Sequence, residues 1–157
     1  MWIDTPESKQ LVTEVSKEII LEIAPEESEL VDELLDDYYS NPAVHETKDS
    51  PLGFGSELLA ASTPVVAMAL QTFFSFVLGE VWTSVQKESA VLIAQKMKTL
   101  INPTKEKIEP GLGLSREQLE KAKQLIKKEA IRGGMKPKKA EDLALRIVGR
   151  IALTSQA

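Results

Sequence analysis

Apolar residues recur at helical spacing near the start of the chain and form two amphipathic segments. The first covers residues 5–23, where charged positions alternate with an apolar face made of Leu11, Val12, Val15, Ile19, Ile20 and Ile23. Pro25 and the glutamates after it are typical of the first turn of a new helix, because carboxylates favour the positive end of the helix dipole. This second helix should end near Tyr39, so residues 1–40 are predicted to form an acidic helical pair.

The middle of the chain holds its longest uncharged run. Residues 58–79 are 22 consecutive positions without Asp, Glu, Lys or Arg. The Ser-Thr-Pro sequence at 62–64 offers N-caps and a first-turn proline, and no further proline occurs between Pro64 and Pro103. We therefore predict that the segment 58–102 forms a long helix, continuous from Pro64 to Ile101, uncharged in its first half and amphipathic in its second, with Gly79 as its only weak point.

The end of the chain carries clear signals for two more helices. Ser115 and Gln118 form a capping-box pattern, the pair Gly133–Gly134 ends that helix, and Pro137 begins the last one. Residues 115–157 are therefore predicted to form a basic helical hairpin. The proline- and glycine-containing stretches 41–57 and 103–114 have no sustained period and are interpreted as linkers.

These elements define the expected fold class. No alternation of apolar and polar residues indicates a strand. The prediction is an all-α helical bundle of about five helices, with one long central helix and a C-terminal helical hairpin.

One face of the predicted long helix consists of small or polar residues, and the remaining face is bulky. Side chains four positions apart fall on the small face, where a second helix can approach closely, in a membrane or in a soluble bundle. The predicted helix-packing or membrane segment combines both faces with the tryptophan that follows: Ala67, Gln71, Phe73, Phe74, Ser75, Val77, Gly79, Trp82 and Thr83.

Residues 58–82 are also long enough to cross the hydrocarbon core of a bilayer, although several Ser, Thr and Gln residues dilute the run. Trp82 would suit the membrane interface or the edge of a soluble core equally well. If the segment spans a membrane, the 3 Lys and Arg before it and the 16 after it place the C-terminal side in the cytoplasm. Membrane contact and burial in protein both remain open at this point.

The net charge of -5 conceals a strong asymmetry along the chain. Residues 1–50 hold 14 acidic and 3 basic side chains, whereas residues 105–157 hold 7 and 13. The predicted basic surface on the hairpin consists of Lys136, Lys138, Lys139, Arg146 and Arg150. Phosphates of lipid or nucleic acid are conceivable ligands for it. We favour attraction to the acidic segment, within the fold or on a second copy, and do not expect nucleic-acid binding.

No catalytic constellation is evident in the sequence. The chain has no cysteine, and its single histidine, His45, falls in the predicted linker 41–57, so zinc sites and His-assisted nucleophiles lack their ligands and bases. The acidic run that includes Asp32 and Asp36 is better explained as a solvated or basic-facing surface than as a cation site. We predict no catalytic residues, no metal and no cofactor, and a cytoplasmic location because no secretory signal is present.

Two functional hypotheses follow. The first is a non-enzymatic helical interaction protein, an adaptor or self-assembling module, whose long helix packs against a partner protein or a second copy. The alternative is a membrane-acting protein, an anchor or pore-forming effector, that inserts residues 58–82. In general layout, an acidic helical head, an uncharged helix and a basic helical tail resemble small effector proteins of bacterial defence systems that act at membranes.

Overall fold

Every regular element in the described part of the chain is helical. The computed structural model describes residues 1–40, 61–101 and 112–155, with side chains described as far as Ile151. These residues form six α-helices, listed in chain order: α1 (Pro6–Ile23), α2 (Val31–Ser40), α5 (Ser62–Phe76), α6 (Ala90–Ile101), α7 (Arg116–Arg132) and α8 (Pro137–Ser155). The predicted all-α helical bundle is confirmed. His45, the predicted linker 41–57 and most of the linker 103–114 lie outside the described residues.

Short helical turns connect the longer elements. They are three 3-10 segments and one π-helical turn: η1 (Trp2–Asp4), η2 (Pro25–Leu30), η4 (Val85–Lys87) and the π turn η3 (Val77–Val81). The second N-terminal helix therefore begins as the 3-10 segment η2 and continues as α2, which is why the proline and its glutamates precede the regular α-helix.

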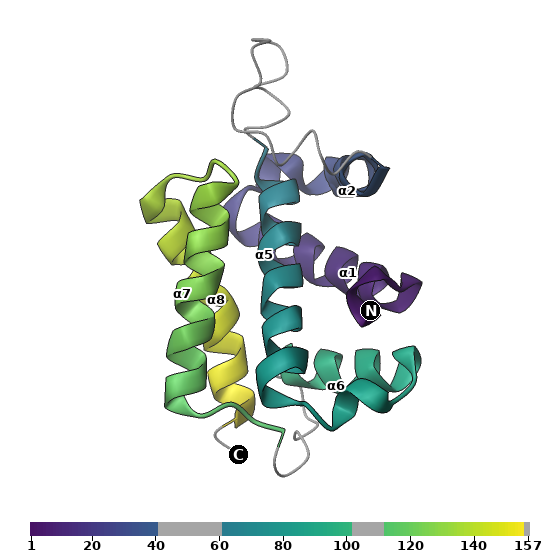
Figure 1. Cartoon of the computed structure of the whole chain (residues 1–157). Coiled ribbons are helices and arrows are strands. Elements are labelled where there is room, and N and C mark those ends of the chain that lie inside the picture. Colours follow the sequence, from purple (N-terminus) through teal and green to yellow (C-terminus); the bar gives the residue numbers. More distant parts are fainter. Residues whose placement is uncertain (41–60, 102–111, 156–157) are drawn as a thin grey trace.

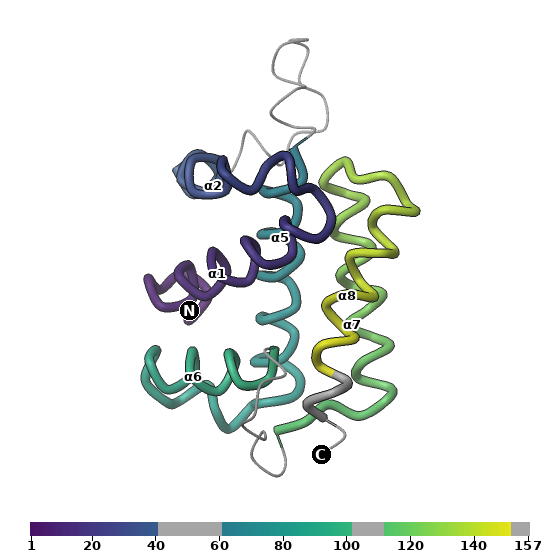
Figure 2. The backbone as a smooth tube through the Cα atoms, turned by 180° about the vertical axis from the view of Figure 1, so that it is seen from behind, coloured from purple at the N-terminus to yellow at the C-terminus, as the bar shows by residue number. Residues whose placement is uncertain are grey.

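Helix α5 runs through the middle of the molecule (Figure 1). It packs against α7, α1 and α2, and the view from behind shows α7 and α8 together on one side of it and α1 on the other (Figure 2). Twelve of its 15 residues are buried. The apolar character of this segment is therefore used by the protein's own core, as expected for a helix that is hydrophobic on nearly all sides.

The predicted continuous helix is wrong beyond Phe76. After the π turn Val77–Val81, Trp82 leaves helical geometry with φ -103° and ψ 53°, and regular helix resumes only at Ala90. The indole of Trp82 is buried and its Nε1–H donates to the carbonyl of Leu112 at 2.7 Å. A straight continuation would have carried the apolar face of α6 away from the core, whereas the break lets α6 fold back onto α1 and α8.

The start of α5 also differs from the prediction. The helix begins at Ser62 with Ala61 as N-cap, and no side chain of the cap itself binds the first turn. Instead the carboxylate of Glu27, in η2, accepts hydrogen bonds from the backbone N–H groups of Ser62 and Thr63, both at 2.9 Å. An acidic side chain is favourable there, because the exposed N–H groups carry the positive end of the helix dipole. Ser62 and Thr63 are thus capped residues and do not act as caps.

The C-terminal hairpin forms as its local signals indicate. Ser115 and Gln118 make both hydrogen bonds of the capping box, and α7 and α8 pack along their lengths. Gly134 adopts φ +102°, a conformation that favours glycine, and the N–H of Met135 reaches back to the carbonyl of Ala130 at 3.0 Å. The glycine pair therefore reverses the chain within a few residues.

Candidate interaction surface

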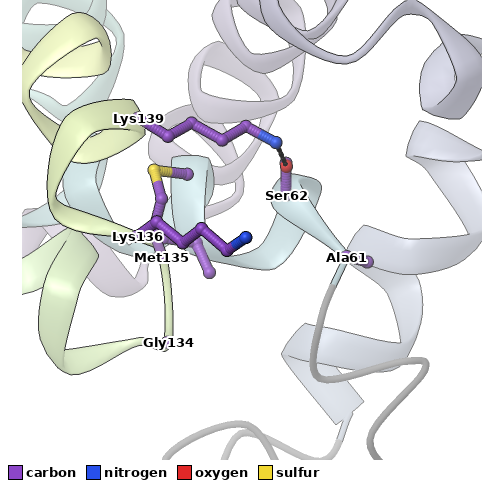
Figure 3. Close-up of a pocket in the computed structure, with 7 residues that line it drawn as sticks. Ala61, Ser62, Gly134, Met135, Lys136 and Lys139 are labelled. Atoms are coloured by element: carbon purple, nitrogen blue, oxygen red, sulfur yellow. Dashed lines mark hydrogen bonds between the residues drawn. The ribbon is translucent and has the colours of Figure 1, made fainter.

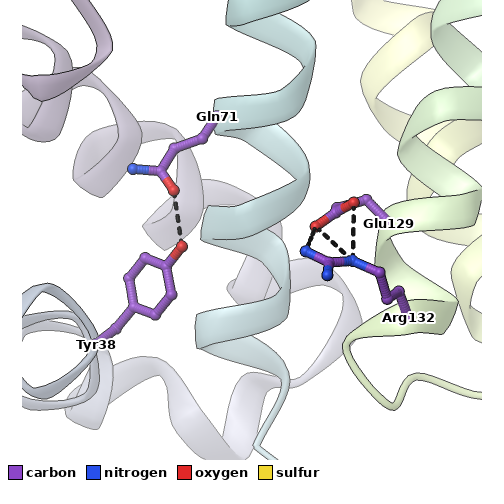
Figure 4. Close-up of polar contacts among 4 residues, drawn as sticks. All are labelled: Tyr38, Gln71, Glu129 and Arg132. Atoms are coloured by element: carbon purple, nitrogen blue, oxygen red, sulfur yellow. Dashed lines mark hydrogen bonds and ion pairs between the residues drawn. The ribbon is translucent and has the colours of Figure 1, made fainter. Parts of the chain in front are cut away.

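The structure divides the predicted helix-packing segment between core and surface. The bulky residues Phe73, Phe74 and Val77 are fully buried, and Trp82 is 1% exposed. The small face of the predicted helix, which we call the small-residue stripe, is divided between core and surface. Ala67 is buried, and Gln71 is half-buried and accepts a hydrogen bond from the hydroxyl of Tyr38 at 2.8 Å (Figure 4). The stripe's remaining members, Ser75, Gly79 and Thr83, are exposed.

The exposed end of this stripe borders an apolar crevice of about 210 Å³. Its walls come from the N-terminal segment, the end of α5 with η3, the short turn η4 and the start of α6: Met1, Trp2, Ile3, Ser75, Leu78, Gly79, Gln86 and Ile93. No acidic or basic side chain is among these lining residues. We call this hollow the α5 crevice. Apart from one serine and one glutamine, it offers apolar contacts to a ligand.

Specific contacts hold the walls of the α5 crevice in place. The Nε1–H of Trp2 donates to the carbonyl of Ala90 at 3.0 Å, and its ring meets Phe74 edge to face at 6.0 Å between centroids. On the opposite wall, the side-chain amide of Gln86 donates to the carbonyl of Leu78. The N-terminal segment is therefore fixed against both α5 and α6, although it contributes little regular structure.

Large apolar side chains remain exposed on two elements that line the crevice. Met1 is 99% exposed, and Val91 and Leu92, which precede Ile93 in the first turn of α6, are 53% and 45% exposed. A Cβ added at Gly79 would meet nothing within 4 Å. Single exposed apolar residues are ordinary, so the apolar hollow itself is the feature that indicates a binding surface.

The predicted basic surface separates into two groups with different surroundings. Arg146 and Arg150 lie against α1, where Arg146 pairs with Glu22 at 3.4 Å and Arg150 pairs with Glu18 at 3.7 Å. These contacts join the basic end of the chain to its acidic beginning, as the charge asymmetry suggested. Asp142, at hydrogen-bond distance on α8, is the main cause that raises the pKa of Arg146.

The lysines of the basic surface lie at the other end of α8. Lys136 and Lys139 line a cavity of about 340 Å³ between the start of α5 and the α7–α8 turn (Figure 3). The Nζ of Lys139 donates to the hydroxyl of Ser62 at 2.7 Å. Lys138 is exposed on the first turn of α8 and is not a lining residue. We call this hollow the lysine cavity.

The remaining lining of the lysine cavity consists of small or apolar residues: Ala61, Ser62, Val65, Gly134 and Met135. Met135 and Val65 are buried, and no Asp or Glu is among the lining residues. Gly133 allows the turn to approach α5, because a Cβ there would come within 3.3 Å of Val65. The sequence identified the lysines. It did not identify Val65 and Met135 as lining residues. The adjacent glycines were the one sequence signal that the α7–α8 turn comes close to another element.

No protein-family model, curated protein or solved structure matches the chain.

The described residues contain one further hollow and one tyrosine with a strongly shifted pKa. A third hollow, between α1 and α2, is lined in part by Lys9, Asp36 and Tyr39. Burial raises the pKa of Tyr39, with a smaller contribution from Tyr38, so the phenol stays neutral near physiological pH. Within residues 1–40, 61–101 and 112–155, no group of three or more His, Cys, Asp or Glu side chains is arranged to hold a metal ion.

In the described residues, one helical run is long and apolar enough to cross a membrane by length and composition. This run is Ser62–Val81, with a mean hydropathy of 1.5. In its most apolar 18-residue window, 67% of the residues are buried inside the protein. A core helix of a soluble protein has the same character.

Proposed function

We propose that this chain is a non-enzymatic helical interaction protein, and that the α5 crevice binds the apolar face of a helix from a partner protein. The observation that carries the proposal is the position of the crevice: it lies where the small-residue stripe of α5 leaves the core, and Met1, one of its lining residues, is 99% exposed. In the residues with described side chains, the core already covers the first half of the stripe, so only its exposed end is available to a partner.

The chemistry of the crevice favours an apolar helix over a charged ligand. No Asp, Glu, Lys or Arg side chain lines it, and the amide of Gln86 is already bonded to Leu78. Ser75 and Gly79 present little side-chain bulk, so a helix backbone can come close. An amphipathic helix that places apolar residues three and four positions apart in such a groove is a common mode of recognition. Its apolar side chains would gain stabilisation by leaving water.

A substitution that places a bulky side chain in the α5 crevice tests this proposal. Gly79→Phe places a bulky ring where a Cβ meets nothing, so the protein should fold normally and lose partner binding. Gly149→Phe is the matched control, because Gly149 is an exposed glycine of α8 with equally open surroundings. Circular dichroism and thermal melts establish that both variants are folded.

A photo-crosslinking amino acid at position 79 or 149 then identifies the partner in cells. We expect a discrete product from position 79 and none from 149. The captured protein, once purified, should bind the wild type and Gly149→Phe in calorimetry, and should not bind Gly79→Phe. Equal products from both positions, or equal binding by both phenylalanine variants, would refute the crevice as the binding surface.

A membrane-acting protein is the second candidate, and one observation favours it: the uncharged run Ser62–Val81 has the length and hydropathy of a spanning helix. In the described structure α5 is enclosed by its neighbours, so insertion would require α1 and α7 to separate from it. Flotation with anionic and neutral liposomes distinguishes the candidates. Protein that floats with liposomes and becomes protected from protease over residues 62–81 supports insertion, whereas protein that stays in the soluble fraction excludes it.

A further inference from the structure

The lysine cavity is lined by positively charged and apolar side chains, and by no negatively charged one. Lys136 and Lys139 line it together with the buried side chains of Val65 and Met135, and no Asp or Glu is among the lining residues. Lys139 uses one of its donors on the neutral hydroxyl of Ser62 and retains others. Lys136 is exposed and extends toward the start of α5 (Figure 3). A ligand that suits this cavity combines an anion with a short apolar group.

The η2 segment of the same protein presents that combination on its surface. Leu30, at the end of η2, is 46% exposed. Glu29 and Glu33 are exposed on either side of it in the sequence. Glu27 differs from them, because its carboxylate is already bonded to the start of α5. The segment therefore offers an apolar side chain between carboxylates that are open to solvent.

These two surfaces are neighbours on one end of the molecule. Ser62 lines the lysine cavity and its backbone N–H donates to Glu27 of η2, so the cavity and the η2 segment both adjoin the start of α5. The α7–α8 turn and α2 likewise lie toward the same end of α5 (Figure 1). Adjacent surfaces that are complementary to each other form a closed pair when two copies are related by a twofold axis.

We propose that two copies of the chain associate reciprocally, each inserting Leu30 and its flanking carboxylates into the lysine cavity of the other. Apolar contact between Leu30 and Met135 provides affinity, and the lysines fix the register by pairing with Glu29 and Glu33. This interface is separate from the α5 crevice, so an assembled pair presents two copies of the partner-binding surface.

Sedimentation velocity of the full chain across a concentration series tests the proposal. We expect a dimer whose dissociation constant rises with salt, because the lysine contacts are screened. Leu30→Ser should weaken the dimer at least about tenfold, the equivalent of roughly 1.4 kcal/mol. Leu21→Ser is the matched control, since Leu21 is another exposed leucine, at 61%, on α1. It should leave the dissociation constant unchanged.

Charge exchange supplies a second and independent readout. Lys136→Glu and Glu29→Lys should each weaken the dimer, and the double variant should recover it, because each site then faces its opposite charge again. Lys87→Glu, an exposed site on η4, should have no effect. A chain that is monomeric at every concentration, or a dimer indifferent to Leu30→Ser and Lys136→Glu, would overturn the proposal.

Phosphatidylglycerol vesicles test for a lipid occupant. Wild-type monomer that binds these vesicles, with binding lost in Lys136→Glu, would assign the cavity to an anionic headgroup and also overturn self-association. Gly79→Phe should dimerise normally, so failure of the crevice proposal and failure of this one give different results.

Discussion

Oε1 of Glu27 binds Thr63 at two points, accepting hydrogen bonds from its backbone N–H and from its hydroxyl, each at 2.9 Å. Oε2 accepts from the N–H of Ser62. One side chain from η2 therefore satisfies two of the N–H groups that a helix start leaves without intrahelical partners. This contact ties the acidic N-terminal part of the chain to the central helix.

Glu27→Ala should lower the free energy of unfolding by about 1–3 kcal/mol, because it leaves two N–H groups and a hydroxyl of α5 without their acceptor. Glu27→Gln keeps one acceptor oxygen and should cost less. Urea denaturation followed by circular dichroism measures both. Glu26→Ala, at the exposed neighbouring position, is the control and should change stability by less than about 0.5 kcal/mol. Equal losses at both positions would contradict a specific role for Glu27.

The sequence was sufficient to predict those structural features that depend on residues close together in the chain. The apolar spacing of α1, the capping box at Ser115 and the glycine pair at 133–134 each act within a few positions, and all three correspond to observed features. The apolar run of α5 was likewise visible as a pattern, and its burial follows from that composition.

The features that the sequence did not reveal depend on residues far apart in the chain. The cap on α5 comes from Glu27, 35 positions before Ser62, and the carbonyl that fixes the break at Trp82 belongs to Leu112, 30 positions later. Helix propensity marked Gly79 as the weak point, but it did not show that Trp82 leaves helical geometry, where its buried indole donates to a carbonyl far along the chain. The separation of the basic residues into arginines that pair with α1 and lysines that line the lysine cavity also depends on contacts between distant parts of the chain.

Trp82→Phe tests the cause of the helix break. The phenyl ring keeps most of the apolar contact and removes the donor to Leu112, so stability should fall by about 1–3 kcal/mol. Trp2→Phe is the comparison, because its indole also donates to a backbone carbonyl, that of Ala90, from a half-buried position. It should cost less. If Trp82→Phe unfolds at the same urea concentration as the wild type, the hydrogen bond to Leu112 does not stabilise the break.

Two polar contacts shown in Figure 4 should differ in their effect on stability. Tyr38 is buried, and its hydroxyl donates to Gln71 across the α2–α5 contact, so Tyr38→Phe should cost about 0.5–1.5 kcal/mol. Arg132 pairs with Glu129 at 2.7 Å within α7, where its side chain is 53% exposed. Arg132→Ala should cost less than about 0.5 kcal/mol, because solvent and salt screen that pair. Thermal melts in matched buffers measure both, and a larger loss from Arg132→Ala would reverse the expected order.

Ser16 offers a route to a more stable protein. Its hydroxyl is buried on the inner face of α1 and has no hydrogen-bond partner in the described structure. Ser16→Ala removes this unsatisfied group and introduces a better helix former, so the free energy of unfolding should rise by about 1 kcal/mol. Thr13→Ala is the control on the same helix, since the hydroxyl of Thr13 already donates to the carbonyl of Lys9. A loss of stability in Ser16→Ala would mean that the hydroxyl does have a partner in solution.

Lys127 and Glu141 form an ion pair between the two helices of the hairpin, and its contribution to stability should depend on pH. The Nζ of Lys127 lies 2.7 Å from the Glu141 carboxylate, and this hydrogen bond is the largest cause that lowers the pKa of Glu141. Because the pKa is lower in the folded state than in the unfolded state, the resulting stability is present above the unfolded pKa and is lost as pH falls through the folded pKa.

We expect a carbon-detected NMR titration to place the midpoint of Glu141 below that of an ordinary glutamate, and Lys127→Met to raise it. Lys128→Met is the control, because Lys128 is the exposed neighbour on α7 and is not among the residues that shift the Glu141 pKa. An unchanged Glu141 midpoint in Lys127→Met would show that the pair does not persist in solution.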